Sequence, residues 1–197
     1  MAQLFHRSMN SLARFTFFGL PLLFMGSAVS GAVIYRSGYL TGRGEVVDQP
    51  VPFSHKHHVG QLGIDCRYCH TSVETSSFAG IPPTKTCMNC HNQMWAGSEM
   101  LTPVRESYKK DESIPWERVH NLPDYVYFNH SIHIARGLNC NTCHGPINQM
   151  HITMKGNSFQ MAWCLQCHRA PERYLRDDKS GLTPRQQVFN NYWKLQT

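Results

Sequence analysis

The stretch FNHSIHIARGLNCNTCH, from Phe128 to His144, gathers three histidines and two cysteines within seventeen residues. Its last five residues form the pattern C-x-x-C-H, in which two residues separate Cys140 from Cys143 and His144 follows directly. In this pattern the two thiols add across the two vinyl groups of a haem, and the histidine binds the iron from the proximal face. The stretch therefore predicts a covalently attached c-type haem.

The same pattern occurs four times and uses all eight cysteines of the chain. Zinc ribbons and redox-active C-x-x-C pairs are the alternatives for paired cysteines. The histidine after every pair argues against both, because four such matches by chance have a probability on the order of one in a hundred thousand. We therefore predict four haem c groups, with proximal iron ligands His70, His91, His144 and His168 and thioether bonds to Cys66, Cys69, Cys87, Cys90, Cys140, Cys143, Cys164 and Cys167.

A second pattern, F-x-H-x-x-H, precedes the haem motifs twice. It begins at Phe53 and again at Phe128, and each copy is followed by two C-x-x-C-H motifs. Internal repetition of this kind indicates a duplicated structural unit. We expect two-haem repeats over residues 53–110 and 128–175, which together form a tetrahaem domain over residues 53–175.

The histidines of the second pattern are candidates for the distal face of the haems. An iron held by one histidine keeps an open sixth position, and a second histidine closes it to give an electron carrier. Residues three apart share one face of a helix but cannot both occupy one free position, so each pair is expected to serve two different haems. The predicted distal ligands are His55, His58, His130 and His133, with His120 as a reserve candidate.

The alternative is that some of these histidines are surface residues or are hydrogen-bonded to haem propionates. His57 lies between two better candidates and is not expected to bind iron. The sequence does not pair each distal histidine with its iron.

The segment FTFFGLPLLFMGSAVSGAVIY, residues 15–35, contains no charged residue. About 20 apolar residues span a hydrocarbon core, so the segment predicts one transmembrane anchor. A signal peptide cleaved after Ala28-Val29-Ser30, or a buried core helix, is the alternative. Haem attachment to C-x-x-C-H takes place outside the bacterial cytoplasm. We therefore expect residues 1–14 in the cytoplasm, a linker over 36–52 and the haem domain on the periplasmic side of the inner membrane.

The length and the net charge of the chain limit the folds and the partners that are possible. Four haems in the part outside the membrane leave about 40 residues for each, a size at which chains usually need covalent or metal help to fold. We expect a haem-cored fold of loops and short α-helices with little or no sheet, and a C-terminal tail over 176–197. The formal charge is +6, but eight propionates offset it and no basic run exceeds two residues, so no nucleic-acid partner is expected.

Four segments carry a resemblance to known families: PVPFSHKHHVGQLGIDCRYCH, GIPPTKTCMNCH, RVHNLPDYVYFNHSIH and MAWCLQCHR. With the preceding apolar segment, they resemble class III (c3/c7-like) multihaem cytochromes c, and in particular the membrane-anchored multihaem subunit (ActA) of alternative complex III. The resemblance implies an electron-transfer subunit of a menaquinol-oxidising respiratory complex. It also implies an iron–sulfur subunit, polytopic quinol-binding membrane subunits and a monohaem cytochrome c as partners.

This chain departs from that family in one respect, because the family's subunit commonly carries five haems and this sequence has four motifs. The main alternative is a stand-alone tetrahaem quinol dehydrogenase of the NapC/NrfH type. An enzyme proper, reducing nitrite or a sulfur compound, requires an iron with an open position. The plentiful distal histidines favour a non-catalytic electron-transfer subunit instead.

Overall fold

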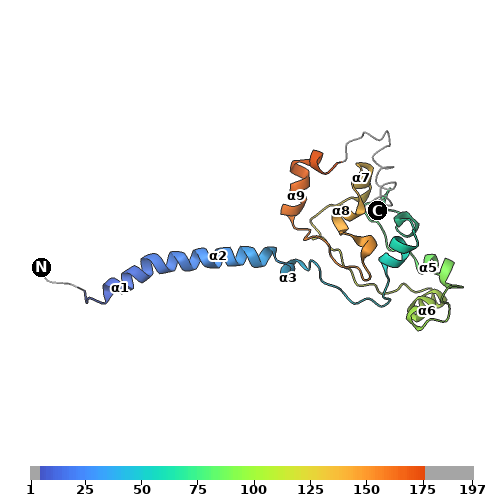
Figure 1. Ribbon diagram of the computed structural model, residues 1–197, viewed down its shortest axis with the longest axis horizontal. Coiled ribbons are helices and arrows are strands. Elements are labelled where there is room, and N and C mark those ends of the chain that lie inside the picture. Colours follow the sequence, from blue (N-terminus) through green and yellow to red (C-terminus); the bar gives the residue numbers. More distant parts are fainter. Residues whose placement is uncertain (1–4, 176–197) are drawn as a thin grey trace. The chain divides into compact units, whose positions relative to one another are not determined.

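The computed structural model describes residues 5–175 of the 197-residue chain. The chain divides after Gly42 into an N-terminal and a C-terminal unit, which Figure 1 shows in blue and in cyan to red. The tail predicted over residues 176–197 lies outside the described residues.

The N-terminal unit is a helix that runs without a break from Met9 to Arg36. It consists of α1 (Met9–Arg14), a π-helical turn η1 (Phe15–Gly19) and α2 (Leu20–Arg36), and the short α3 (Gly38–Thr41) follows. The change to π hydrogen bonding falls directly before Pro21, which has no N–H to donate into the helix. The helix exceeds the apolar segment predicted over 15–35 at both ends, because backbone hydrogen bonding continues into polar residues that remain good helix formers.

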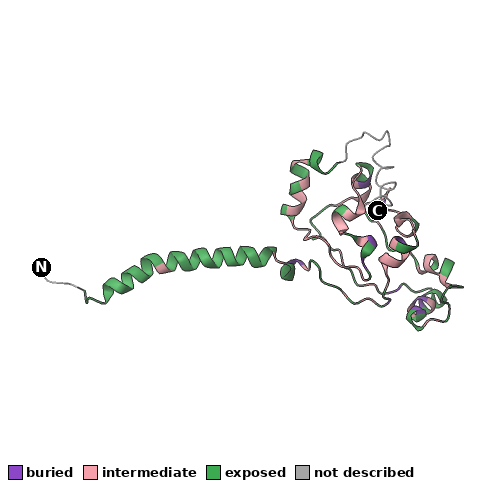
Figure 2. Cartoon of the chain, in the orientation of Figure 1, coloured by how far each residue is buried: buried purple, intermediate pink, exposed green. Residues whose placement is uncertain are grey.

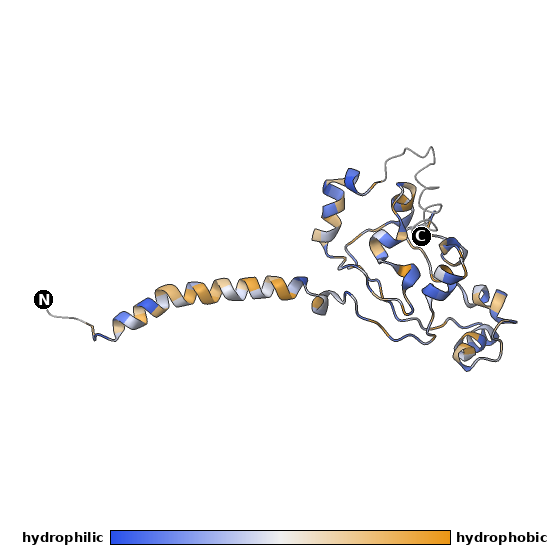
Figure 3. Ribbon diagram, viewed as in Figure 1, coloured by the Kyte–Doolittle hydropathy of each residue, from blue (hydrophilic) through white to orange (hydrophobic). Residues whose placement is uncertain are grey.

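Length and composition make this helix able to cross a membrane. Its most apolar window has a mean hydropathy of 1.9, and none of that window is buried within the chain. Figure 2 shows the helix exposed along almost its whole length, and Figure 3 shows apolar residues over most of α2.

The C-terminal unit consists of short helices joined by long irregular segments. In the described part of this unit no strand forms, and β pairing is limited to isolated bridges of Arg43 with Lys155 and of Val46 with Met154. The predicted architecture of loops and short helices without a sheet is therefore confirmed. The helices are η2 (Lys56–Gln61), α4 (Cys66–Cys69), α5 (Thr84–His91), η3 (Glu99–Leu101), α6 (Thr102–Lys110), α7 (His130–Ala135), α8 (Cys140–His144), η4 (Ile147–Gln149), α9 (Met161–Arg169) and η5 (Pro171–Arg173).

Side chains alone make only a small core in this unit. Among the described residues, eight hydrophobic side chains are buried, and none of the large ones is fully buried. The main cluster joins α6 to the segments before and after it: Val51, Leu101, Val104 and Ile114, with Trp116 packed against them. Most of the motif cysteines and histidines are instead half-buried. The motif cysteines and histidines therefore make up much of the partly buried surface of this unit.

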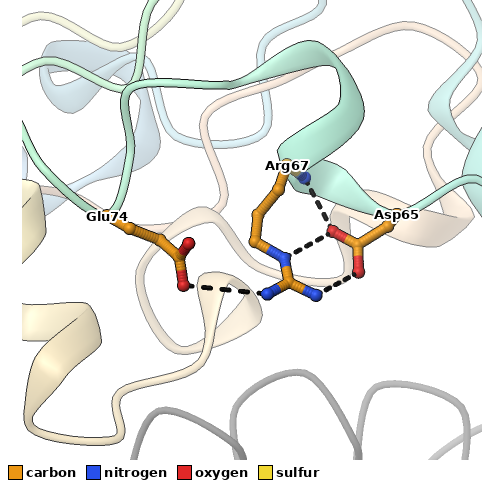
Figure 4. Close-up of polar contacts among 3 residues, drawn as sticks. All are labelled: Asp65, Arg67 and Glu74. Atoms are coloured by element: carbon orange, nitrogen blue, oxygen red, sulfur yellow. Dashed lines mark hydrogen bonds and ion pairs between the residues drawn. The ribbon is translucent and has the colours of Figure 1, made fainter.

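Three helices that carry motif residues begin at a capping side chain. Asp65 accepts a hydrogen bond from the Arg67 amide before α4, Asn129 caps α7 in the same way, and Asn139 caps α8. Such a cap is typically worth about 1 kcal/mol. At α4 the cap is also part of an ion pair, because the Arg67 guanidinium lies 2.8 Å from Asp65 Oδ2 and 3.7 Å from Glu74 (Figure 4).

Replacing Asp65 with asparagine is expected to remove part of the acid sensitivity of the fold. Hydrogen bonds donated by the Arg67 side chain hold the pKa of the Asp65 carboxyl below its ordinary value of 3.8. A carboxyl with a lowered pKa contributes stability that is present above its unfolded pKa and is lost as the pH falls through its folded pKa. Asparagine keeps the cap but has no charge. The wild type should therefore be more stable than Asp65→Asn near neutral pH, and the gap should close below about pH 4.

Chemical denaturation of the haem-loaded protein from pH 7 down to pH 3 measures this difference. The matched control is Glu106→Gln on α6, where Glu106 pairs with Lys110 at 3.5 Å on an exposed surface. That pair should contribute little at any pH. A gap between wild type and Asp65→Asn that stays constant over the whole range would rule out the ion pair as its source.

Candidate haem sites

Each C-x-x-C-H motif forms or ends a helical turn. The pairs Cys66–Cys69 and Cys140–Cys143 lie in α4 and α8, while the other two pairs lie near the ends of α5 and α9. Residues three apart on a helix share one face, so both sulfurs of a pair point to the same side. The motif histidine follows directly and lies at the end of the same turn. We name the four motifs by their histidines: the His70, His91, His144 and His168 motifs.

The two F-x-H-x-x-H segments adopt the same local geometry. Phe53 lies edge-on to His55 at 4.9 Å between ring centroids and stacks on His58 at 4.4 Å. In the second segment Phe128 lies edge-on to His130 at 4.8 Å and stacks on His133 at 4.5 Å. The phenylalanine thus fixes the orientation of both histidines. Sequence reasoning used these phenylalanines only to recognise the repeat and gave them no role.

The ring nitrogens of most candidate ligands are arranged for metal binding. Nδ1 lies within hydrogen-bond distance of a carbonyl oxygen in five of them: His58 with Ser54 at 2.9 Å, His70 with Gly80 at 2.6 Å, His91 with Met94 at 3.0 Å, His130 with Ser77 at 2.7 Å and His133 with Asn129 at 2.7 Å. A carbonyl only accepts, so Nδ1 carries the proton and Nε2 keeps its lone pair. This is the tautomer and the orienting contact that metal-ligating histidines generally show.

Three pairs of one distal and one proximal ring share nearly the same separation, with interplanar angles of 64° for His58 and His91, 70° for His133 and His168, and 7° for His130 and His144. The ring centroids lie 6.1 Å apart for His58 and His91, 6.1 Å for His133 and His168, and 6.3 Å for His130 and His144. Metal–imidazole bonds of about 2 Å on both sides of one ion hold the two centroids about 6 Å apart. The residues present therefore fit bis-histidine haem irons. His55, the fourth distal candidate, has His70 among the neighbouring histidines that lower its pKa.

Burial keeps these histidines neutral. It lowers the pKa of His55 to about 4 and that of His144 to about 3, in both cases with smaller contributions from neighbouring histidines. It also lowers the pKa of His58 and His130, where a backbone hydrogen bond acts in the opposite direction. A neutral imidazole is the form that binds iron, so the sites favour their ligand form at neutral pH.

His120, the reserve candidate, lies beside His144 rather than opposite it. The two ring centroids are 4.3 Å apart, which is too short for both rings to bind one iron. Its Nε2 is buried without a hydrogen-bond partner in the described structure, and Phe159 packs on the ring edge at 5.5 Å. Burial lowers the pKa of His120 to about 4. Its geometry favours packing against the proximal ligand over sharing its iron.

His57, which is not predicted to bind iron, contacts a side chain of its own segment and an indole ring. Its Nδ1 lies 2.8 Å from Gln61 Oε1, and its ring stacks on Trp95 at 6.1 Å. His57 therefore makes its contacts with side chains of its own repeat.

The cysteines connect the four motifs in space. The thiols of Cys66 and Cys140, the first cysteines of the His70 and His144 motifs, shift each other's pKa. The Cys140 thiol, with burial second, raises the pKa of Cys66, and the Cys66 thiol lowers the pKa of Cys140. Burial, followed by the charges of Cys87 and Cys90, raises the pKa of Cys69. Burial, followed by the charges of Cys167 and Cys164, raises the pKa of Cys143.

A glycine contact fixes the backbone of the His144 motif. A Cβ on Gly156 would overlap the carbonyl oxygen of His144 and lie 2.8 Å from the Cα of Gly145. Both neighbours are backbone atoms, which cannot rotate away. Gly145 itself has a φ of 75°, a conformation that favours glycine. The loop 145–156 therefore folds back onto the motif only because residue 156 has no side chain.

The substitution Gly156→Ala is expected to destabilise the haem-loaded protein by about 1–3 kcal/mol, the usual range for an inserted methyl group in a tight site. The effect should be local to the His144 site. Thermal denaturation followed by haem absorption measures it. The control is Gly97→Ala, because a Cβ at Gly97 would have no neighbour within 4 Å. Equal melting temperatures for both variants would contradict the assigned role of Gly156.

Comparison of the sequence with known families identifies the class of protein to which these sites belong. The sequence profile of a family described as "Cytochrome c7 and related cytochrome c" matches residues 51–110 and 126–184. The chain belongs to this cytochrome c7 family. It is therefore a multihaem cytochrome c that transfers electrons through c-type haems.

One curated relative of this cytochrome c7 chain is the multihaem cytochrome c subunit of a menaquinone reductase from Nitratidesulfovibrio vulgaris. The two sequences are 39% identical over 98 residues, which cover 49% of this chain and 46% of the relative. The chain thus spans about half the length of the curated relative that it matches.

Proposed function

We propose that this cytochrome is the membrane-anchored electron-transfer subunit of a respiratory complex that exchanges electrons with menaquinone and menaquinol. It carries four haem c groups, attached through the eight cysteines and held from the proximal side by His70, His91, His144 and His168. The observation that carries this proposal is the set of facing histidine rings at 6.1–6.3 Å. Each such pair would supply both histidine ligands of one iron and would leave no open position on it for a substrate.

The ring separations support a definite pairing of distal with proximal ligands. His58 pairs with His91, His133 with His168, and His130 with His144. Equivalence of the two repeats then pairs His55 with His70. In each repeat the first histidine of F-x-H-x-x-H serves the first motif and the second histidine serves the second motif.

The haems supply one-electron chemistry, in which iron alternates between its ferric and ferrous states. The polypeptide fixes the axial ligands, holds their Nδ1 protons on carbonyl oxygens and buries the rings away from water. These are the properties by which a protein sets haem potential and limits side reactions. No catalytic residue is proposed within this subunit.

The N-terminal helix supports a membrane location. We propose that Met9–Arg36 is retained as a single-pass anchor in a bacterial inner membrane, with the haem domain in the periplasm. The other possibility, a cleaved signal sequence, predicts a shorter mature protein. Intact mass of the chain purified from washed membranes distinguishes the two.

The partners follow from the resemblance to the alternative complex III subunit. They are an iron–sulfur subunit, polytopic quinol-binding membrane subunits and a monohaem cytochrome c, with menaquinol oxidation as the overall direction. The curated relative is a subunit of a menaquinone reductase, which favours a second candidate, in which the same kind of subunit feeds electrons towards menaquinone. The two candidates share the haem chemistry and differ only in the direction of electron flow.

Purification of the haem-staining complex from membranes in mild detergent tests this proposal. Its subunits are identified by mass spectrometry, and the complex is then mixed separately with a menaquinol analogue and, after dithionite reduction, with a menaquinone analogue. Rapid haem reduction by the quinol supports the oxidising complex, whereas rapid haem oxidation by the quinone supports the reductase. A lone tetrahaem protein that the quinol reduces unaided would instead favour the NapC/NrfH-type dehydrogenase.

A further inference from the structure

The distal candidate His55 differs from the other three in the group that faces its Nδ1 atom. His58, His130 and His133 each place Nδ1 against a backbone carbonyl oxygen, at 2.9, 2.7 and 2.7 Å respectively. The Nδ1 of His55 instead lies 3.0 Å from a side-chain oxygen, Oγ1 of Thr153. Of the four distal candidates, His55 is therefore the one whose orienting oxygen a single substitution can remove.

The hydroxyl that faces His55 comes from the other repeat. Thr153 lies in the second repeat, 98 residues after His55 in the first. The same exchange occurs in the opposite direction, because the carbonyl oxygen that faces His130 belongs to Ser77 of the first repeat. His55 and His130 hold equivalent places in the two F-x-H-x-x-H segments. The two repeats thus share this arrangement and differ in the chemistry of the oxygen that accepts.

Hydrogen bonds on both sides of Thr153 hold its loop in place. Before it, the Met150 carbonyl accepts a hydrogen bond from the Lys56 amide at 2.9 Å. After it, the Lys155 carbonyl accepts one from the Gly44 amide at 2.8 Å. The backbone is therefore fixed close to Thr153 in both directions, so its hydroxyl has a defined position against the histidine ring.

We propose that Thr153 is a positioning residue that sets the potential of the haem whose iron His55 binds. This inference rests on the proposed function, because it requires His55 to be an axial ligand. With Nε2 on the iron, Nδ1 carries the proton and donates a hydrogen bond to Thr153 Oγ1. An acceptor at Nδ1 makes the imidazole a stronger donor to the metal, which favours ferric over ferrous iron.

The chemistry of the acceptor gives the direction of the effect. A hydroxyl oxygen accepts a hydrogen bond less strongly than an amide carbonyl oxygen does. His55 is therefore a weaker donor to ferric iron than His130, and this contact raises the potential of its haem relative to that of the equivalent haem. Reduction adds one electron to the iron, and the Nδ1 proton stays on the ring in both oxidation states.

A redox titration of the haem-loaded full chain in detergent, followed by haem absorption, tests the substitution Thr153→Val. Valine keeps the shape of threonine but offers no acceptor, so the preference of His55 for ferric iron should fall about tenfold. For a one-electron couple, this change raises one midpoint potential by about 59 mV. The variant Thr153→Ser keeps the hydroxyl and should titrate like the wild type. The control is Thr75→Val, which removes an exposed hydroxyl 3.5 Å from the Ser72 carbonyl and should shift no potential.

The variant Thr153→Asn decides the question if the valine variant does not mature. Asparagine offers an uncharged carbonyl oxygen, the kind of acceptor that the other distal histidines have, so one midpoint potential should fall. Unchanged potentials in Thr153→Val, or an unchanged or raised potential in Thr153→Asn, would overturn the role of Thr153. A Thr153→Ser protein that shifts as far as Thr153→Val would also overturn it, because a loss of packing would then explain both.

The variant His55→Ala separates failure of this inference from failure of the proposed function. Electron paramagnetic resonance of the oxidised variant should show one high-spin haem. That signal, together with unchanged potentials in Thr153→Val, overturns only the role of Thr153. A His55→Ala protein with low-spin haems alone overturns the assignment of His55 in the proposed function as well.

Discussion

The double substitution Cys140→Ala, Cys143→Ala is expected to yield a chain with three haems that does not accumulate as a stable protein. Both thioether bonds of the His144 haem are lost. The His144 ring lies 4.3 Å from that of His120 and 6.3 Å from that of His130, and burial lowers the pKa of His144 to about 3. Because side chains alone form a small core among the described residues, the loss of this haem removes packing from both repeats. Haem staining, intact mass and thermal denaturation measure the outcome.

The matched control is Cys164→Ala, Cys167→Ala. This pair lies on α9, and its motif histidine, His168, is exposed. The control should also lose one haem. It should keep the hydrogen bonds between the repeats, such as those of the Lys56 amide with the Met150 carbonyl and of the His130 ring with the Ser77 carbonyl. It should therefore retain a cooperative unfolding transition. Recovery of a stable Cys140→Ala, Cys143→Ala chain that still binds four haems would show that the His144 motif does not attach haem.

The substitution His133→Ala should leave every covalent haem in place and convert one of them to the high-spin state. The His133 ring faces His168 at 6.1 Å and is oriented by the Asn129 carbonyl and by Phe128. If His133 binds iron as proposed, alanine removes one strong ligand, which weakens the ligand field. It also removes a donor that favours ferric iron, so the potential of that haem should rise. Electron paramagnetic resonance and a redox titration of the oxidised protein measure both effects.

Added imidazole should restore the low-spin state of His133→Ala, because the cavity left by the ring accepts a free ligand. The control is His57→Ala, whose histidine bonds to Gln61 and stacks on Trp95 rather than facing a motif histidine. That variant should keep all haems low-spin. An entirely low-spin His133→Ala protein, or a high-spin His57→Ala protein, would contradict the assignment of distal ligands.

The sequence predicts the parts of this molecule that depend on local spacing. The C-x-x-C-H turns and the apolar helix are each encoded within a short segment, and both form in the expected places. The two F-x-H-x-x-H segments likewise share one geometry, because in each segment the phenylalanine contacts both histidines. Local patterns of this kind need no knowledge of the tertiary fold.

The parts that the sequence does not predict depend on residues far apart in the chain. His55 is oriented by Thr153, and His130 is oriented by Ser77. Neither threonine nor serine stands out in the sequence, and the contact of Gly156 with the His144 motif has no local signal either. The separations between distal and proximal rings likewise depend on the folded chain rather than on local spacing. The position of His120, 4.3 Å from the His144 ring, has no local signal either.

The measurement that tests the central claim most directly is electron paramagnetic resonance of the oxidised full-length protein, combined with its intact mass. The account predicts a mass equal to the chain plus four haems and a spectrum with only low-spin ferric iron. A mass with fewer haems, or a high-spin signal in the wild-type protein, would contradict the assignment of four bis-histidine electron-transfer sites.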